Sequence, residues 1–274
     1  MKLAILNGRL NPTMVETVER LRARHVTVDL IGPEVDVTEL TGLRPTHDLY
    51  YLKTASEPLL SLAGALHAAG AETLNPYPSV AVLSNKLIAV AALKRAGLPV
   101  PETWIASEGS KLAPLLEAGP LILKPHRGSR GRGVRVVRQP GELSLTTDVP
   151  VLAQRYHPPD GRDFKVYCIG VRVFAVRRAW PCADWRAKLD QSEPVEPDDR
   201  LRELALRCGR ALGLGLFGLD VVVSKGQTWV VDVNKCAGFL GVPDAPSFLC
   251  DYLTVACEQA RARATSRDDR IPTP

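Results

Sequence analysis

Two short segments decide the fold of this chain: Phe217-Gly-Leu-Asp-Val-Val-Val223 and Trp229-Val-Val-Asp-Val-Asn234. Both are rich in Val and bounded by turn residues, a pattern typical of buried β-strands. Lys225-Gly226 between them predicts a turn, so the two segments form a β-hairpin. Each strand carries a carboxylate, Asp220 on the first and Asp232 on the second.

The polar residues of this hairpin indicate a metal site. Side chains two positions apart point to the same face of a strand, so Asp232 and Asn234 project together, and strand pairing can bring Asp220 beside them. Two carboxylates and an amide oxygen among apolar residues are costly unless a cation lies between them. Hard oxygen ligands without His or Cys suit Mg²⁺. The alternative is that both aspartates are strand-end residues that face water.

Length and composition are those of an ordinary soluble globular protein. The chain has 274 residues, 45% of them hydrophobic and 24% charged, which is enough for one large domain or several small ones. A formal charge of +5 fits anionic small-molecule substrates and is too small to indicate a nucleic-acid partner. Composition leaves the oligomeric state open.

The signal-peptide region, the apolar runs and the cysteines of the sequence together predict a cytoplasmic protein. The apolar run that starts at Met1 ends at Asn7-Gly8-Arg9, so no signal peptide is expected. No apolar run approaches the roughly 20 residues needed to span a membrane. The six cysteines form no CxxC pair and no Cys/His cluster, so we expect reduced, mostly buried thiols rather than a zinc site.

Turn residues divide the chain at Leu74-Asn-Pro-Tyr-Pro78. Residues 1–78 alternate strand and helix patterns, which predicts a βαβ unit with a parallel sheet. Its predicted strands are 2–6, 25–31 and 47–52, and its predicted helices are 13–24 and 58–69. The second part predicts helices over 79–96, 198–212 and 247–263. Further strands are predicted over residues 120–124, 133–137, 151–154, 165–169 and 171–177. Residues 264–274 are polar and are predicted to form a disordered tail.

A basic, glycine-rich turn, Arg127-Gly128-Ser129-Arg-Gly131-Arg-Gly133, follows the strand that ends at Lys124. Glycines let backbone N–H groups approach an anion closely, and successive amides form a nest for phosphate oxygens. An ammonium at the end of an apolar strand needs a partner, and a nucleotide phosphate is a natural one. The alternative is a solvated basic loop, and the turn matches neither a P-loop nor GxGxxG at a helix start.

A second polar connection follows the strand Val151 to Gln154, which runs into Arg155-Tyr156-His157. Asp163 begins the next strand a short loop later. On this spacing the strand end can offer its backbone to a base, and Asp163 can bond a sugar hydroxyl. The pattern adds a base contact and a ribose contact to the phosphate contact expected at Lys124.

In this order the segments resemble the ATP-grasp superfamily, over about residues 75–250. The residues that carry the resemblance are Ser84-Asn-Lys86, Ala96-Gly-Leu-Pro-Val-Pro101, the Lys124 strand with its glycine-rich turn, Gln154-Arg-Tyr156, Asp163, Asp220 and Asp232-Val-Asn234. The resemblance implies an α/β and α+β protein with an ATP-grasp fold. Residues 1–78 would be the βαβ pre-domain, and 79–153 and 154–263 would be two α+β subdomains that clasp ATP.

Roles for individual residues follow from the resemblance. It implies that Lys86 and Lys124 hold phosphates and that the turn from Gly128 to Gly133 covers them. The adenine contacts would come from Gln154, Arg155 and Tyr156, and the ribose contact from Asp163, with Lys165 close by. The metal ligands for one or two Mg²⁺, with Mn²⁺ as a substitute, would be Asp220, Asp232 and Asn234.

Two branches of the superfamily look alike here. The RimK-type carboxylate–amine ligases share the short amino-terminal unit and the layout. The ATP-grasp inositol polyphosphate kinases are similar at Phe164-Lys-Val-Tyr-Cys-Ile-Gly170, Arg177-Arg-Ala-Trp-Pro181 and Asp232-Val-Asn-Lys-Cys-Ala-Gly238. The chain departs from the ligases at Arg155, where Glu is common, and at Asp232, where Glu is more frequent.

Three functions follow, and the first is preferred. The chain would be a ligase that joins a carboxylate to an amine through an acyl phosphate, a kinase acting on a hydroxyl of an inositol-phosphate-like substrate, or a nucleotide-binding module without turnover. In either enzyme Arg177 or Arg178 would offset charge on the transferred group. The sequence does not identify the acceptor, and a small anionic or amino-acid-like substrate is expected. The cationic residues that can line an anionic pocket, or can instead be solvated surface charges, are Arg9, Arg177, Arg178, Arg186 and Lys188.

Overall fold

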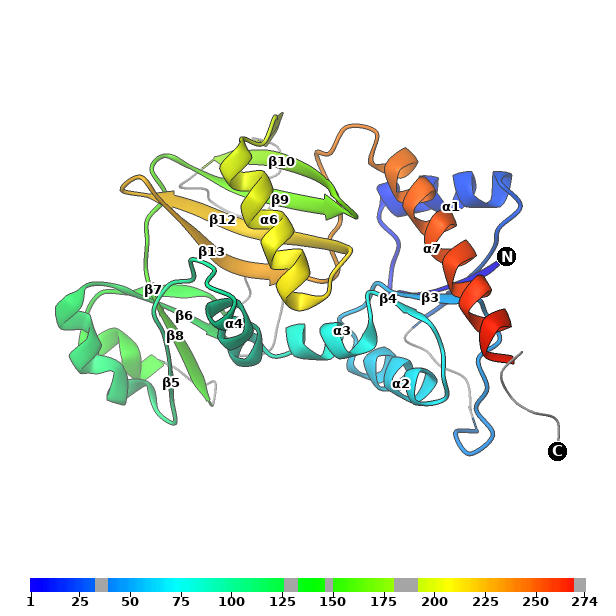
Figure 1. Cartoon of the computed structure of the whole chain (residues 1–274). Helices are drawn as coiled ribbons and strands as arrows, with labels where there is room; N and C mark the ends of the chain where they lie inside the picture. The colour runs from blue at the N-terminus through cyan, green and yellow to red at the C-terminus, as the bar shows by residue number, and fades with distance from the viewer. Residues whose placement is uncertain (33–38, 126–132, 146–149, 180–191, 269–274) are drawn as a thin grey trace.

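The computed structural model describes residues 1–32, 39–125, 133–145, 150–179 and 192–268. Its strands form three sheets that follow one another along the chain, with helices packed on them (Figure 1). None of the helices in these described ranges is long and apolar enough to cross a membrane.

The amino-terminal sheet is parallel and has the order β2-β1-β3-β4. Its elements are β1 (Lys2–Leu6), α1 (Pro12–Ala23), β2 (Thr27–Ile31), β3 (Leu49–Leu52), α2 (Glu57–Ala68) and β4 (Thr73–Leu74). Asn11 begins α1, because its side chain accepts a hydrogen bond from the Met14 amide. The second strand starts at Thr27 rather than at His25, which has a φ of 60° in the preceding turn. The predicted βαβ unit is confirmed.

The middle sheet is antiparallel and has the order β5-β8-β6-β7. Its elements are β5 (Thr103–Ala106), β6 (Leu121–Pro125), β7 (Arg135–Val137) and β8 (Val151–Arg155), with 3₁₀ helices η1 (Gly109–Ala118) and η2 (Pro140–Leu145). Leu112 of η1 and Leu143 of η2 pack with Leu121 and Val137 in one apolar core. The sequence pattern missed β5, a short strand at the edge of this sheet.

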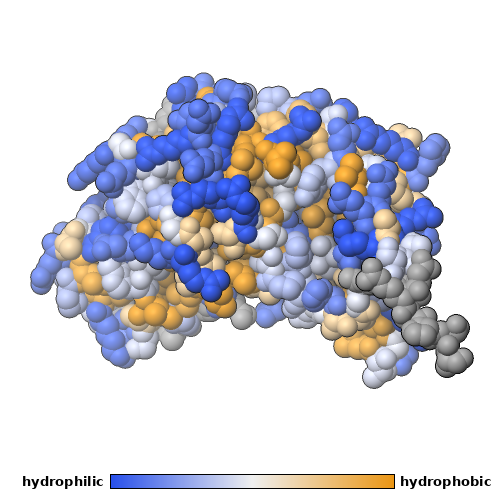
Figure 2. All heavy atoms as spheres, viewed as in Figure 1, coloured by the Kyte–Doolittle hydropathy of each residue, from blue (hydrophilic) through white to orange (hydrophobic). Residues whose placement is uncertain are grey.

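The third sheet has the order β11-β10-β9-β12-β13. Its strands are β9 (Arg162–Ile169), β10 (Arg172–Ala179), β11 (Glu193–Val195), β12 (Leu216–Ser224) and β13 (Gln227–Asn234). Helix α6 (Asp199–Leu212) covers one face of it, and the surface around the outer side of α6 is largely hydrophilic (Figures 1 and 2). The turn between β12 and β13 is Lys225-Gly226, with φ of 51° and 73°, as a tight hairpin of this twist requires.

The helix expected over residues 79–96 is two helices. They are α3 (Tyr77–Leu83) and α4 (Lys86–Arg95). Asn85 separates them, because it has an extended backbone and its side chain accepts a hydrogen bond from the Leu87 amide. The break puts Lys86 in the first turn of α4, beside the carboxylate site described below. Periodicity alone did not show it, since both helices have apolar residues at helical spacing.

The last helix, α7 (Ala245–Asp268), packs against α1 and on the amino-terminal sheet (Figure 1). Its buried residues Leu249, Leu253 and Cys257 share a core with Leu3 and Ile5 of β1. It continues past Arg263, where the sequence pattern ended, and residues 269–274 of the predicted tail lie outside the described residues. The carboxyl-terminal segment therefore ties the amino-terminal unit to the rest of the chain.

Candidate nucleotide and metal site

The predicted metal-binding residues lie together on one face of the five-stranded sheet. Asp220 of β12 lies directly opposite Asp232 of β13, and Gly218 lies opposite Asn234. Val231 has no partner in the register, so β13 bulges there. The other face packs against α6, which leaves the polar face free of that helix. Spacing along β13 accounts for the shared face of Asp232 and Asn234, and the bulge at Val231 brings Asp220 onto the same face.

Asp220 is held by two cations, Lys165 of the adjacent strand β9 and Arg178 of the next strand, β10. Its carboxylate accepts hydrogen bonds from Lys165 Nζ at 2.9 Å and from Arg178 Nη2 at 2.7 Å. Burial alone would raise the pKa of Asp220, but these two cations more than offset it, so the pKa lies well below its usual range. Gly218 makes room for Lys165, because a Cβ at position 218 would lie 3.2 Å from Lys165 Cε. Asp220 is therefore ionised at neutral pH.

Asp232 and Asn234 have different surroundings. Lys86 Nζ donates to Asp232 Oδ1 at 2.6 Å, and the carboxylate is 38% exposed. Asn234 Oδ1 accepts from the Cys236 amide at 2.8 Å, which fixes the side chain at the end of β13. Among the described residues, no three Asp, Glu, His or Cys side chains gather as a metal cluster, so the set is two carboxylates and one amide.

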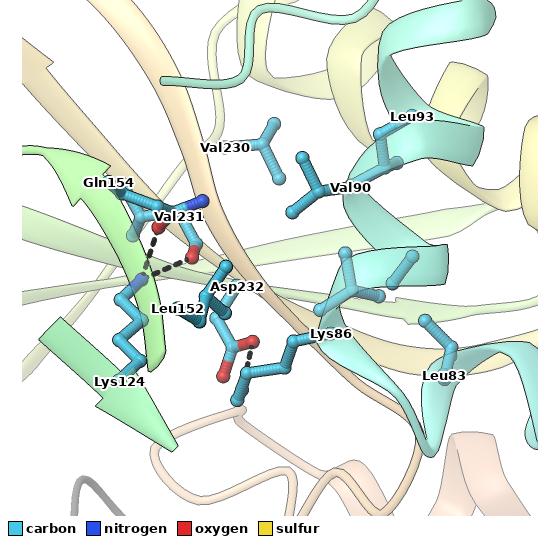
Figure 3. A pocket seen from close by; sticks show the side chains of 12 residues that line it. Leu83, Lys86, Val90, Leu93, Lys124, Leu152, Gln154, Val230, Val231 and Asp232 are labelled. Carbon is cyan, nitrogen blue, oxygen red and sulfur yellow. Dashed lines mark hydrogen bonds and ion pairs between the residues drawn. The ribbon is translucent and has the colours of Figure 1, made fainter. Parts of the chain in front are cut away.

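A pocket adjoins Asp232 between the middle sheet, α4 and β13 (Figure 3). Its polar residues are Lys86, Lys124, Gln154 and Asp232. The apolar residues of its wall are Leu83, Ala89, Val90, Leu93, Leu152, Val230, Val231 and Val233. The pocket thus has an apolar end and a charged end, with the paired aspartates beside the charged end.

Lys124 reaches into this pocket from the end of β6. Its Nζ donates to Gln154 Oε1 at 2.6 Å and to the carbonyl of Val231 at 2.9 Å (Figure 3). The β13 bulge turns that carbonyl toward the lysine. Burial, offset in part by Asp232, lowers the pKa of Lys124 to about 8. A bound anion would favour the charged form, so this lysine is suited to phosphate.

Gln154 lies inside the pocket, but Arg155 points away from it. Gln154 Nε2 donates to Thr103 Oγ1 at 3.0 Å, which fixes its orientation toward Lys124. The Arg155 guanidinium instead donates to the carbonyls of Leu115 and Gly119 and lies 5.1 Å from the centre of the Trp104 ring. Any contact of Arg155 with adenine would therefore have to be made by its backbone N–H or C=O group. The structure gives no side-chain contact of Tyr156 with the site, and its amide donates to the carbonyl of Pro120.

The two arginines proposed as catalytic separate onto opposite faces of β10. Arg178 makes two hydrogen bonds to Asp163, at 2.9 and 3.1 Å, and one to Asp220. Arg177 is exposed on the other face and pairs with Glu193 at 2.6 Å. Neighbouring residues of a strand face opposite ways, so only one of them can serve this site. Asp163, expected at a ribose, is buried against Arg178 instead.

Part of the predicted phosphate turn lies outside the described residues, including Gly128, Ser129 and Gly131, as do Arg186 and Lys188. Gly133 is described and has a φ of 72°, a left-handed conformation that glycine adopts without strain. The sequence analysis missed the apolar wall from α4 and the carbonyl of Val231. Helical spacing of Leu83, Val90 and Leu93 was visible, but it did not distinguish a pocket wall from core.

Replacing Arg155 with Met is expected to destabilise the fold by about 2–3 kcal/mol. The guanidinium is the donor to the carbonyls of Leu115 and Gly119, and two partly buried acceptors left without this donor together carry a desolvation cost of this size. Urea unfolding followed by circular dichroism measures the loss. Arg177→Met is the matched control, since its exposed ion pair is worth about 1 kcal/mol or less. Equal stability of the two variants would contradict the structural role of Arg155.

The three sheets, with a pocket between the middle and five-stranded sheets and a carboxylate face beside it, define an ATP-grasp protein. A solved structure shares this fold, the RimK domain protein ATP-grasp from Sphaerobacter thermophilus. Its TM-score is 0.75 at 22% identity, covering 92% of this chain and 99% of that chain.

A family model described as the RimK-like ATP-grasp domain matches residues 83–244, and the chain belongs to this family. It is 28% identical over 190 residues to a probable alpha-L-glutamate ligase 2 of Shewanella amazonensis, covering 64% of this chain and 63% of that protein. It is also 28% identical over 187 residues to a ribosomal protein bS6–L-glutamate ligase of Escherichia fergusonii, covering 63% and 62%. The match thus spans less than two thirds of these relatives. The resemblance found in the sequence is confirmed.

Proposed function

We propose that this chain is an ATP- and Mg²⁺-dependent ligase that joins a carboxylate to an amine. The observation that carries the proposal is the pairing of Asp220 with Asp232 across the hairpin, beside a pocket that contains Lys86 and Lys124. Family membership supports ATP as the nucleotide. Both curated relatives described above bear the names of ligases, and this favours the ligase over the inositol phosphate kinase.

The pocket fits a nucleotide with its base at the apolar end. Leu83, Val90 and Leu93 of the helical side face Leu152 and Val230, which offers two apolar walls to a flat base. The ammonium groups of Lys124 and Lys86 lie at the opposite end, near Asp232, and suit phosphate oxygens. The nucleotide would therefore lie with its base at the apolar end of the pocket and its phosphates at the charged end.

The donor set fits Mg²⁺. Asp220 and Asp232 are directly opposed, Asn234 shares their face, and all three offer hard oxygen atoms. Lys86 contacts Asp232 through Oδ1 and leaves Oδ2 for a metal. Asp220 accepts from Arg178 at Oδ1 and from Lys165 at Oδ2, so a metal would use the remaining lone pair of one of these Asp220 oxygens. The chemistry of these residues suits a metal that, when bound, would neutralise the negative charge of the phosphates.

The proposed reaction has two steps. A carboxylate oxygen of the substrate attacks the γ-phosphorus of ATP, the bond to the β-phosphate oxygen breaks, and ADP leaves. An amine nitrogen then attacks the acyl carbon, phosphate leaves with the bonding electrons, and the amine proton goes to solvent. Lys124 and Lys86 orient the phosphates, and Arg178, held by Asp163 and Asp220, offsets charge at the transferred group.

Trapping with hydroxylamine tests the ligase reaction directly. The protein, ATP, Mg²⁺ and a panel of acidic amino acids, peptides and phosphorylated polyols are incubated with and without hydroxylamine. We expect a carboxylate-dependent hydroxamate and release of ADP and phosphate in equal amounts. ADP release with phosphorylated polyols, with no phosphate release and no hydroxamate, would identify the kinase. ATP binding without ADP release from any of these compounds would identify the non-catalytic module.

A further inference from the structure

A buried lysine at the end of β13 has no role in the reaction proposed above. Lys235 follows Asn234 and is 8% exposed. Its Nζ donates to the carbonyl of Val80 at 3.2 Å and to the Ser84 hydroxyl. Both acceptors are neutral, and they lie far away in the sequence, where α3 ends and before α4 begins. Lys235 therefore joins the strand of the proposed metal site to the break between these two helices.

The end of α3 suits this ammonium group. Ser84 is the C-cap residue of α3, and its amide donates to the carbonyls of Val80 and Ala81 at 3.1 Å. Its hydroxyl donates to the carbonyl of Val80 at 2.9 Å, so its oxygen lone pairs are available to accept from Lys235. The last carbonyls of a helix carry partial negative charge, which a cation stabilises. Lys235 thus caps α3 from a distant strand.

A second lysine connects the same two segments in the opposite direction. Lys86, in the first turn of α4, donates to Asp232 Oδ1 at 2.6 Å (Figure 3). Lys86 reaches from the helix break to β13, and Lys235 reaches from the end of β13 to the helix break. One contact would let the two segments pivot about it, whereas two contacts at different points fix their separation and their relative rotation.

The two contacts differ in whether a ligand can replace them. The side chains of Lys86 and Asp232 are 21% and 38% exposed and line the pocket, so a bound phosphate can compete for Lys86. Lys235 is not among the residues that line the pocket, and it is buried against neutral groups. Its contact can therefore stay in place while Lys86 changes partner. A long side chain loses less freedom on binding when its backbone is already held, which favours phosphate binding by Lys86.

We propose that Lys235 is a positioning residue for the nucleotide: it holds the break between α3 and α4 against the end of β13 and so keeps Lys86 within reach of the phosphates. Lys235 acts through Lys86 and contacts no substrate. The inference rests on the proposed ATP-dependent function, because that function supplies the ligand of Lys86. Loss of Lys235 should therefore weaken the binding of ligands that carry phosphates more than the binding of the base.

Calorimetry with a non-hydrolysable ATP analogue and with adenosine, each with Mg²⁺, tests this role. Lys235→Met keeps most of the buried stem and removes the cation, so we expect about 10-fold weaker binding of the analogue and less than about 3-fold weaker binding of adenosine. Ser84→Ala removes one of the two acceptors and should weaken analogue binding about 3-fold without changing adenosine binding. Lys94→Met, at an exposed position of α4, is the control and should bind both ligands as the wild type does.

A double-mutant cycle with Lys86→Met separates positioning from a purely structural role. In the Lys86→Met background the ammonium that Lys235 positions is gone, so adding Lys235→Met should change the affinity for the ATP analogue by less than about 2-fold. A structural lysine would instead cause the same loss in both backgrounds. Urea unfolding shows whether each variant is folded, and Ser84→Ala in the two backgrounds carries the same cycle if Lys235→Met does not fold.

Three results would overturn the inference. They are unchanged affinity of folded Lys235→Met for the ATP analogue, equal losses for the analogue and adenosine, and equal losses with and without Lys86. A wild-type protein that does not bind the analogue would overturn it together with the nucleotide site. The cycle measures binding and needs no turnover. Coupling between Lys235 and Lys86 with no hydroxamate in the trapping assay would therefore reject the ligase and keep the positioning role.

Discussion

Turnover of the Asp232→Asn variant is expected to fall at least about 100-fold below that of the wild-type protein at saturating ATP and millimolar Mg²⁺. The substitution keeps the shape of the side chain and removes one of the two negative charges that face each other across β12 and β13. Loss of that charge weakens the proposed metal site and the neutralisation of the transferred phosphoryl group. A 100-fold loss corresponds to about 2.7 kcal/mol of barrier. ADP release in a coupled assay measures it.

Asp232 is a cleaner test than Asp220. Asp220 forms ion pairs with both Lys165 and Arg178. Asp220→Asn would therefore remove the negative charge that both of these largely buried cations contact, and this would also lower the stability of the fold. Asp232 has one partner, Lys86, and is partly exposed, so the Asn variant should unfold at nearly the wild-type urea concentration. Asp199→Asn, at an exposed position of α6, is the matched control and should keep full turnover. Mg²⁺-dependent ADP release at the wild-type rate from folded Asp232→Asn would reject the metal site.

Strand parity predicted one part of the proposed metal face, the shared side of Asp232 and Asn234, which follows from their spacing in the strand. The two-residue turn at Lys225-Gly226 alone would set Asp220 opposite Val231, and the bulge at Val231 is what brings Asp232 opposite Asp220. The same parity rule also separates Arg177 from Arg178, but it does not say which arginine faces the site. That choice depends on the pairing of β10 with β9, which sets Arg178 against Asp163.

Side-chain direction at strand ends was not predictable. Arg155 follows a residue of the pocket, yet its guanidinium turns back to carbonyls near the end of η1, a 3₁₀ helix that contains Pro114. The break at Asn85 and the bulge at Val231 are also single-residue features that periodicity does not resolve. The buried lysine Lys53 lies at the end of a strand, where a polar residue ordinarily faces water. Its burial comes from the segment after Asn234, far away in sequence.

Replacing Lys124 with Met is expected to weaken ATP binding about 30-fold and to change adenosine binding less than about 3-fold. Met retains most of the apolar stem and removes the ammonium at the charged end of the pocket. The wild-type affinity for ATP should also fall as pH rises from 7 to 9, because burial lowers the pKa of Lys124 to about 8 and the neutral amine has no charge for phosphate. Calorimetry with both ligands at several pH values measures these effects.

The pH dependence distinguishes a phosphate contact from a structural one. In Lys124→Met the affinity for ATP should be nearly constant between pH 7 and 9, since the titrating group is gone. Lys111→Met, whose lysine is 61% exposed on η1, is the control and should keep the wild-type pH profile. Lys124 also donates to Gln154 and to the carbonyl of Val231, so a purely structural lysine would lower the affinity for ATP and adenosine equally. Equal losses for the two ligands, with the pH dependence retained in the variant, would remove Lys124 from the phosphate site.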